Sequence, residues 1–108
     1  MKSLTRKEEL IMLAILNLKT NAYLIAIVDF LSKITGKKVS LTSVHIPLSR
    51  LEKSELITSN YGESTAVRGG RRKKIYRITN LGLEALEEHK RVSDILWENY
   101  PNYFSPKK

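Results

Sequence analysis

Residues 68–77 limit the possible folds of this chain more than any other segment. Six of these ten residues are basic and none is acidic, and two glycines lie among them. Residues 74–79 then alternate apolar and polar side chains, as a half-buried β-strand does. A second β-prone run, at residues 56–59, comes before the basic segment. The two runs, with the glycine-containing loop between them, predict a long β-hairpin.

Two helices are predicted ahead of this hairpin. Thr5 and Glu8 form a capping box at the start of a helix over residues 5–18. Asn21 is a suitable N-cap for the second helix. Gly36 ends it, because glycine readily takes the left-handed conformation found just past a helix.

A third helix is predicted from the N-cap Ser40 to about residue 54. Pro47 lies inside it and removes one helical hydrogen bond, so the helix either kinks there or starts later. Val39, just before it, is predicted to form a very short strand. The side chains expected to face the core are Val44, Leu48 and Leu51, with Ile46 as a further candidate.

A fourth helix is predicted over residues 80–100, capped by Thr79 and ended by Pro101. Gly82 lies in its first turn, where we expect close packing against the first helix. The apolar stripe of this helix runs beyond anything the rest of the chain can cover, which predicts a second copy as partner. The residues predicted at that dimer interface are Ala85, His89, Val92, Ile95, Leu96, Trp97 and Tyr100.

One of these interface residues, His89, has an alternative role. Trp97 is expected to be an interface anchor. His89 is expected to be an interface histidine, although a histidine pKa near ~6.5 could also make dimerisation depend on pH.

The order of elements is helix, helix, short strand, helix, hairpin and long helix. This order predicts a mainly α fold with a small β-hairpin, namely a winged helix-turn-helix followed by a C-terminal dimerisation helix. We divide the chain into a DNA-binding domain at residues 1–79, the dimerisation helix at 80–100 and a tail at 101–108.

Composition narrows the function classes. The net charge of +8 indicates an anionic partner, with nucleic acid first and an anionic membrane surface second. The winged-helix order makes double-stranded DNA the expected nucleic acid. The absence of cysteine excludes disulfides and thiolate metal sites. No nucleophile motif, phosphate-binding loop or metal-ligand spacing is present, so we expect neither an enzyme, nor a cofactor, nor a metal. Without an apolar run long enough to span a membrane, or a signal peptide, we expect a cytoplasmic protein.

Two sets of residues are candidates for DNA contact. The third helix has a polar face that can reach bases and phosphates, although Arg50 has a structural alternative as an ion-pair partner of Glu52 or Glu55. The hairpin supplies cations for phosphates or the minor groove. The helix set is Ser40, Thr42, Ser43, His45, Ser49, Arg50 and Lys53. The wing set is Arg68, Gly69, Gly70, Arg71, Arg72, Lys73 and Lys74.

Three sequence patterns cover most of the chain. They are Val39-Ser40-Leu41-x-x-Val44-His45-x-x-Leu48-x-Arg50-Leu51-Glu52, Arg68-Gly69-Gly70-Arg71-Arg72-Lys73-Lys74-x-Tyr76, and Tyr76-Arg77-Ile78-Thr79-x-x-Gly82-x-x-Ala85-Leu86. Together they resemble the PadR-type transcriptional regulators. This resemblance implies a homodimeric repressor that binds an inverted-repeat operator, with a C-terminal helix that builds the dimer and a small hydrophobic inducer. The chain departs from the family at Glu55, where a glycine is common, and at His45 and Ile46 in the DNA-facing segment.

Two other functions fit the same residues. A nonspecific nucleic-acid binder would bind any duplex equally well. A winged-helix interaction module would use the basic hairpin to bind an acidic protein instead.

Overall fold

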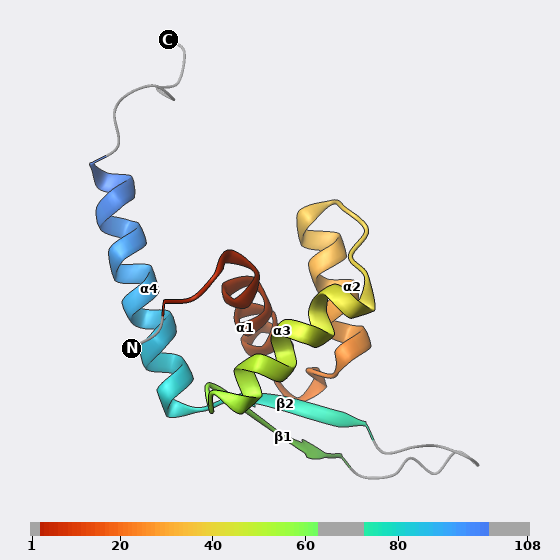
Figure 1. The fold of residues 1–108 in the computed structure, drawn as a ribbon. Coiled ribbons are helices and arrows are strands. Elements are labelled where there is room, and N and C mark those ends of the chain that lie inside the picture. The colour runs from red at the N-terminus through yellow and green to blue at the C-terminus, as the bar shows by residue number, and fades with distance from the viewer. Residues whose placement is uncertain (1–2, 63–72, 100–108) are drawn as a thin grey trace, which may run out of the picture.

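The computed structural model describes residues 3–62 and 73–99 (Figure 1). Within them the chain is mainly helical with one two-stranded antiparallel sheet, so the predicted fold class is confirmed. The elements are α1 (Arg6–Leu18), the 3-10 turn η1 (Lys19–Asn21), α2 (Leu24–Thr35), α3 (Leu41–Lys53), β1 (Ile57–Tyr61), β2 (Lys74–Ile78) and α4 (Asn80–Glu98).

The predicted capping signals of α1 and α3 are present. The Glu8 main-chain N–H donates to the Thr5 hydroxyl at 3.0 Å, and the Thr5 N–H donates back to the Glu8 carboxylate at 2.9 Å. At α3 the Ser43 N–H donates to the Ser40 hydroxyl at 3.1 Å. These bonds satisfy main-chain donors that a helix start leaves without partners.

Two predictions for the segments that connect α1, α2 and α3 are wrong. Asn21 ends η1, and α2 begins later, at Leu24 with Tyr23 as its N-cap. Val39 is not in a strand; its main-chain N–H donates to the Ser32 side chain at 3.1 Å. The hydrogen bond at Val39 stands where propensity predicts a strand, and the 3-10 turn that ends at Asn21 delays the start of α2.

α3 is a single helix from Leu41 through Pro47 to Lys53, so the predicted later start is wrong. Ile46 is 50% exposed, which corrects its predicted core position. The helical period explains this result. Val44 and Leu48 are buried on one face, and Ile46 lies two residues from each of them, on the other side of the helix.

The core lies between α1, α2, α3 and the sheet. Ile11 and Met12 of α1, Ile27 of α2 and Ile57 of β1 are each no more than 1% exposed. The hairpin joins this unit by a main-chain hydrogen bond of 2.9 Å, in which the Tyr76 N–H donates to the carbonyl of Ala22. The helix-turn-helix and the base of the hairpin therefore form one packed unit.

The sheet pairs Ile57 with Ile78 at one end and Tyr61 with Lys74 at the other. Glu55, which precedes β1, has a φ of 65°. This left-handed conformation explains why glycine is common at this position in the resembling family.

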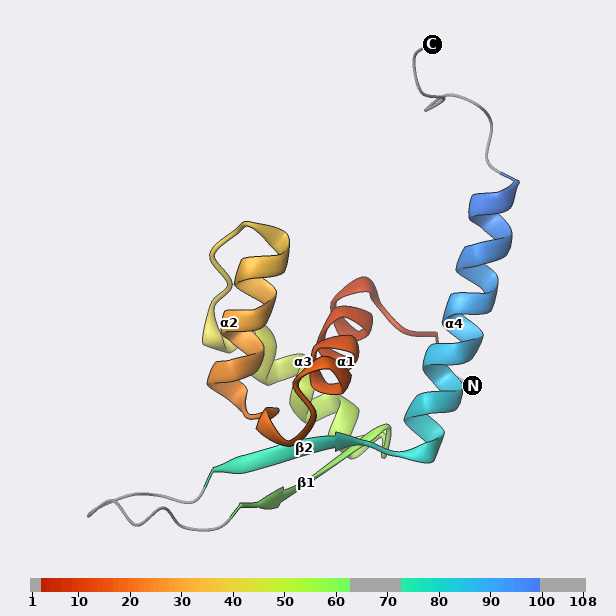
Figure 2. The same cartoon turned by 180° about the vertical axis from the view of Figure 1, so that it is seen from behind.

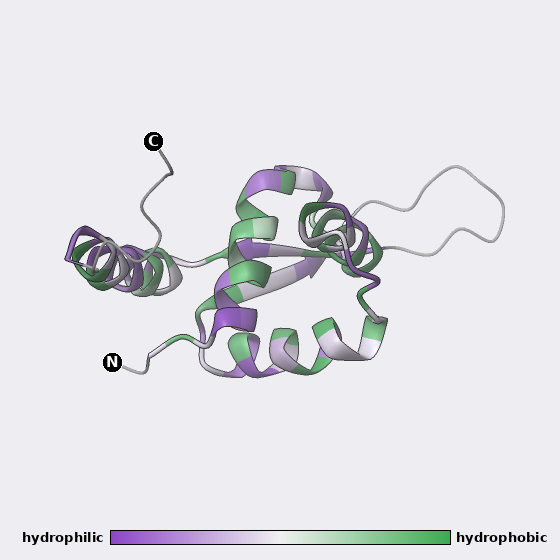
Figure 3. Cartoon of the chain, turned by 90° about the horizontal axis from the view of Figure 1, so that it is seen from above, coloured by the Kyte–Doolittle hydropathy of each residue, from purple (hydrophilic) through white to green (hydrophobic). Residues whose placement is uncertain are grey.

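α4 stands to one side of the other helices (Figures 1–3). Its predicted cap is present, because the Gly82 N–H donates to the Thr79 hydroxyl at 3.0 Å. The helix ends at Glu98, slightly earlier than predicted, and Tyr100 lies outside the described residues. Gly82 packs against the carbonyl of Leu56, which corrects the predicted contact with α1.

No helix in the described part of the chain is long and apolar enough to cross a bilayer. Residues 3–62 and 73–99 also hold no cluster of three histidine, aspartate or glutamate side chains that could bind a metal ion.

Candidate nucleic-acid interface

The polar face of α3 lies opposite the face that packs on the core. Ser40 and Ser43 are already engaged in capping this helix: the Ser43 hydroxyl donates to the Ser40 carbonyl at 2.9 Å, and Ser43 is half-buried. The other predicted contacts are all exposed and recur at helical spacing, so they form one continuous surface. This α3 surface consists of Thr42, His45, Ser49, Arg50 and Lys53, with the exposed Ile46 among them.

The structure describes the surroundings of Arg50 in part. Among the described residues Arg50 forms no ion pair with Glu52 or Glu55, and its contact with DNA stays a prediction. Arg50 is exposed on the α3 surface, and its guanidinium is available to an anion.

Glu52 instead connects α3 to the hairpin. The Ser59 hydroxyl of β1 donates to its carboxylate at 2.5 Å, and the Lys74 ammonium of β2 lies 3.6 Å from its other oxygen. Sequence reasoning missed this role, because nothing in the pattern of residues shows which strand a helix carboxylate will face. The contact fixes the orientation of α3 relative to the hairpin.

The loop end of the hairpin contacts the start of α2. The Lys73 ammonium lies 4.0 Å from the centre of the Tyr23 ring, within range of a cation–π interaction. The Lys74 ammonium lies 5.7 Å from the centre of the Tyr76 ring. Burial raises the pKa of the Tyr76 phenol, and the nearby Lys74 charge partly opposes that shift. Tyr23 is half-buried.

Lys73 and Lys74 are the predicted wing residues that the structure describes, and both are exposed. They lie at the end of the hairpin from which the loop leaves the sheet. The remaining wing predictions, Arg68, Gly69, Gly70, Arg71 and Arg72, fall outside the described residues.

The predicted dimer residues of α4 separate into two groups. Ala85 is 3% exposed and packs inside the chain, and His89 is half-buried with its Nε2 3.3 Å from Glu9 Oε1 of α1. The structure therefore places these two residues at the contact between α4 and the rest of the same chain. The four that remain are between 43% and 65% exposed: Val92, Ile95, Leu96 and Trp97.

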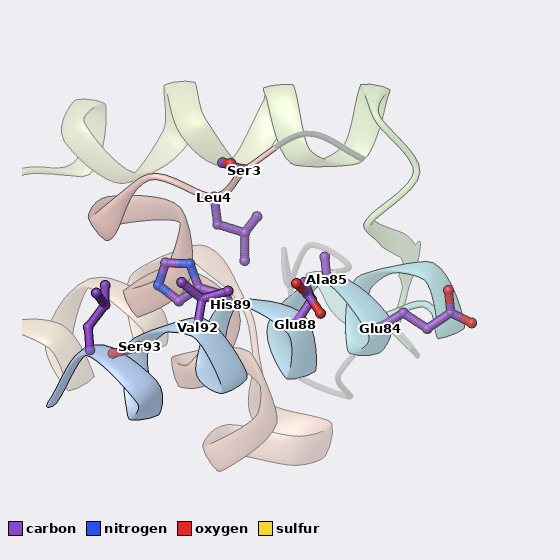
Figure 4. Close-up of a pocket in the computed structure, with 9 residues that line it drawn as sticks. Ser3, Leu4, Glu84, Ala85, Glu88, His89, Val92 and Ser93 are labelled. Atoms are coloured by element: carbon purple, nitrogen blue, oxygen red, sulfur yellow. The ribbon is translucent and has the colours of Figure 1, made fainter. Parts of the chain in front are cut away.

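A groove of about 790 Å³ runs along this side of α4 (Figure 4). Leu4 forms one wall, and Ala85, Val92 and Leu96 supply apolar lining from α4. Apolar side chains thus continue from the intrachain contact onto the exposed half of the helix.

Comparisons with known proteins agree with this architecture. The model of the Transcriptional regulator PadR-like family matches residues 12–88. No curated protein sequence matches the chain.

Solved structures of other proteins have a similar fold. A PadR-like transcription factor from Bacteroides fragilis is 30% identical with a TM-score of 0.70, over 86% of this chain and 87% of its own. A PadR-like transcriptional regulator from Bacillus cereus is 28% identical with a TM-score of 0.65, over 86% and 89%. A PadR family regulator from Eggerthella lenta is 24% identical with a TM-score of 0.69, over 94% and 87%, which supports the fold alone. The chain therefore belongs to the PadR-like family of transcriptional regulators.

Proposed function

We propose that this protein binds a specific DNA operator as a homodimer and represses transcription by occluding a promoter. The observation that carries the proposal is the α3 surface, whose hydroxyl, imidazole and cationic groups are exposed while the opposite face is sealed in the core. Such groups donate to phosphates and base edges in the major groove. The Glu52 contact and the Tyr23–Lys73 contact hold the hairpin beside this surface.

The dimer is proposed to form through α4. Four of its exposed apolar residues, Val92, Ile95, Leu96 and Trp97, lie on the half of the helix that extends away from α1 (Figure 2), where a second copy can cover them. Two α3 helices held about one turn of DNA apart, roughly 34–36 Å, would bind an inverted repeat. We further propose that a small hydrophobic inducer binds the protein and releases it from the DNA, as the family resemblance implies.

Fluorescence anisotropy tests the DNA proposal. The protein is titrated against the duplex upstream of its own gene and against a scrambled duplex, from about 50 to 300 mM salt, a range over which phosphate contacts weaken measurably. We expect tighter binding to the native duplex and a loss of that preference in Arg50→Gln. Lys33→Gln is the matched control, because Lys33 is an exposed cation of α2 that lies outside α3.

Other outcomes point to other functions. Equal binding of both duplexes would contradict operator specificity and favour a nonspecific nucleic-acid binder. If the wild-type protein binds neither duplex at the lowest salt, the DNA proposal fails and the protein-interaction module takes its place.

A further inference from the structure

A basic groove lies on the surface of the helix-turn-helix, where the start of α1, the end of α2 and the start of α3 meet. Its volume is about 780 Å³. The apolar side chains Leu10, Leu31 and Val44 are among those that line it, and Ser40 and Ser43 border it at the start of α3. None of its cations belongs to the candidate DNA contacts described above.

Four cations surround this groove, and no acidic residue is among those that line it. Arg6 is partly neutralised, because its Nη1 lies 3.4 Å from Glu9 Oε1. Lys7, Lys37 and Lys38 are exposed and take part in no ion pair among the described residues. Uncompensated cations gathered in a concave surface attract an anion.

The turn that carries Lys37 and Lys38 has a defined conformation. Gly36 has a φ of 72° and its N–H donates to the Ser32 carbonyl at 3.0 Å. On the other side of the two lysines, the Val39 N–H donates to the Ser32 hydroxyl at 3.1 Å. The main chain on both sides of the two lysines is therefore tied to α2.

This groove and the hairpin lie on opposite sides of α3. In Figure 1 the turn between α2 and α3 is above the start of α3, and the β1–β2 hairpin is below the helix. The major groove is about 12 Å wide and has a phosphate backbone along each edge. A helix inside it therefore has one backbone on each side, and the two basic surfaces match that arrangement.

We propose that the groove binds the phosphodiester backbone of the strand opposite to the one that the hairpin contacts. Lys37 and Lys38 supply the charges closest to α3, with Lys7 and Arg6 further along the same wall. The apolar floor suits the deoxyribose rings between phosphates. This inference rests on the proposed DNA binding, and it adds a second phosphate contact that the α3 surface and the hairpin do not provide.

The salt dependence of binding to a scrambled duplex tests the inference without knowledge of the operator. Each phosphate contact contributes about 0.9 to the slope of log K against log salt. We expect Lys37→Gln/Lys38→Gln to lower that slope by between about 0.9 and 1.8 per protomer, according to whether one or both lysines bind a phosphate. The control, Lys33→Gln/Lys90→Gln, removes the same charge from exposed positions of α2 and α4 that do not line the groove, and its slope should match that of the wild type.

The remaining outcomes separate the two proposals. If the wild type binds the duplex and both double variants keep its slope, this inference is overturned and the proposed DNA binding stands. If the wild type binds no duplex, both fail. A titration with inorganic phosphate, followed by the NMR shifts of the amides at residues 36–40, completes the test. Saturable phosphate binding together with an unchanged DNA slope in the groove variant would identify a small-anion site and overturn the inference.

Discussion

Gly82, in the first turn of α4, lies directly against the main-chain carbonyl of Leu56. A Cβ atom added at Gly82 would overlap the Leu56 carbonyl oxygen, and it would be 2.9 Å from Ile78 Cγ2 and 3.0 Å from the Leu56 carbonyl carbon. The Thr79 N–H donates to the same carbonyl at 3.1 Å, and the Thr79 hydroxyl donates to the Glu55 carbonyl at 2.7 Å. The direction in which α4 leaves the hairpin is therefore set by main-chain contacts around one glycine.

Gly82→Ala will destabilise the protein, although the same change in an open helix stabilises it by about 1 kcal/mol. The new methyl group has to displace backbone, so we expect a loss of about 1–3 kcal/mol in the free energy of unfolding. Urea denaturation monitored by circular dichroism measures this free energy of unfolding. Gly36→Ala is the comparison: its Cβ meets nothing within 4 Å, and only the cost of its positive φ, about 1–2 kcal/mol, applies. A stabilised Gly82→Ala protein would contradict this packing.

Ile46 and Leu48 lie two residues apart on α3 and will respond differently to truncation. Leu48 is 1% exposed, so Leu48→Ala should lower the free energy of unfolding by about 2–5 kcal/mol. Ile46→Ala should change it by no more than about 0.5 kcal/mol, because that side chain is exposed. Ile46→Ala should nevertheless weaken operator binding, because an apolar side chain in the major groove contacts thymine methyl groups. Equal stability losses at the two positions would show that Ile46 packs in the core.

The burial of Tyr76 predicts that the folded protein loses stability at alkaline pH. Burial raises the pKa of its phenol above the unfolded value of about 10, so the unfolded chain ionises first as the pH rises. The stabilisation is complete below about pH 10 and is lost as the pH rises through the folded pKa. Thermal melts between about pH 8.5 and 11.5 measure the effect, with Tyr76→Phe as the control. The Tm of Tyr76→Phe should decline less steeply with pH than that of the wild type. If the two proteins decline identically, Tyr76 is not the cause of the alkaline destabilisation.

Self-association should depend on the exposed end of α4. Leu96 is 65% exposed, so Leu96→Glu should leave the fold of one chain intact while placing a charge in the proposed dimer interface. Light scattering during size-exclusion chromatography should give a dimer for the wild type and a monomer for the variant. Glu98→Gln is the control on the same helix and should remain dimeric. A wild-type protein that elutes as a monomer at all concentrations would contradict the α4 dimer.

Sequence patterns predict what depends on residues close together in the chain. The capping signals at Thr5, Ser40 and Thr79, the hairpin and the polar face of α3 all follow from short spacings or helical periodicity. The errors are partly local, at the start of α2 and at Val39, and partly in contacts between elements. The carbonyl that Gly82 meets and the partners of Glu52 come from parts of the chain whose relative positions spacing alone does not give. Ile46 differs, because its angle around the helix outweighs the apolar character that favours a core position.

Pro47 has a consequence for how α3 moves. Lacking a main-chain N–H, it leaves the carbonyl of Ser43, four residues earlier, without its helical donor. One hydrogen bond is therefore missing between the first turn of α3 and the rest of the helix. The buried side chains of Val44 and Leu48 hold the helix on the core. Deuterium exchange should therefore be faster for the amides before Pro47 than for those after it, and should slow when DNA is bound. The proposed DNA contacts before Pro47 would then adjust to the duplex more readily than those after it.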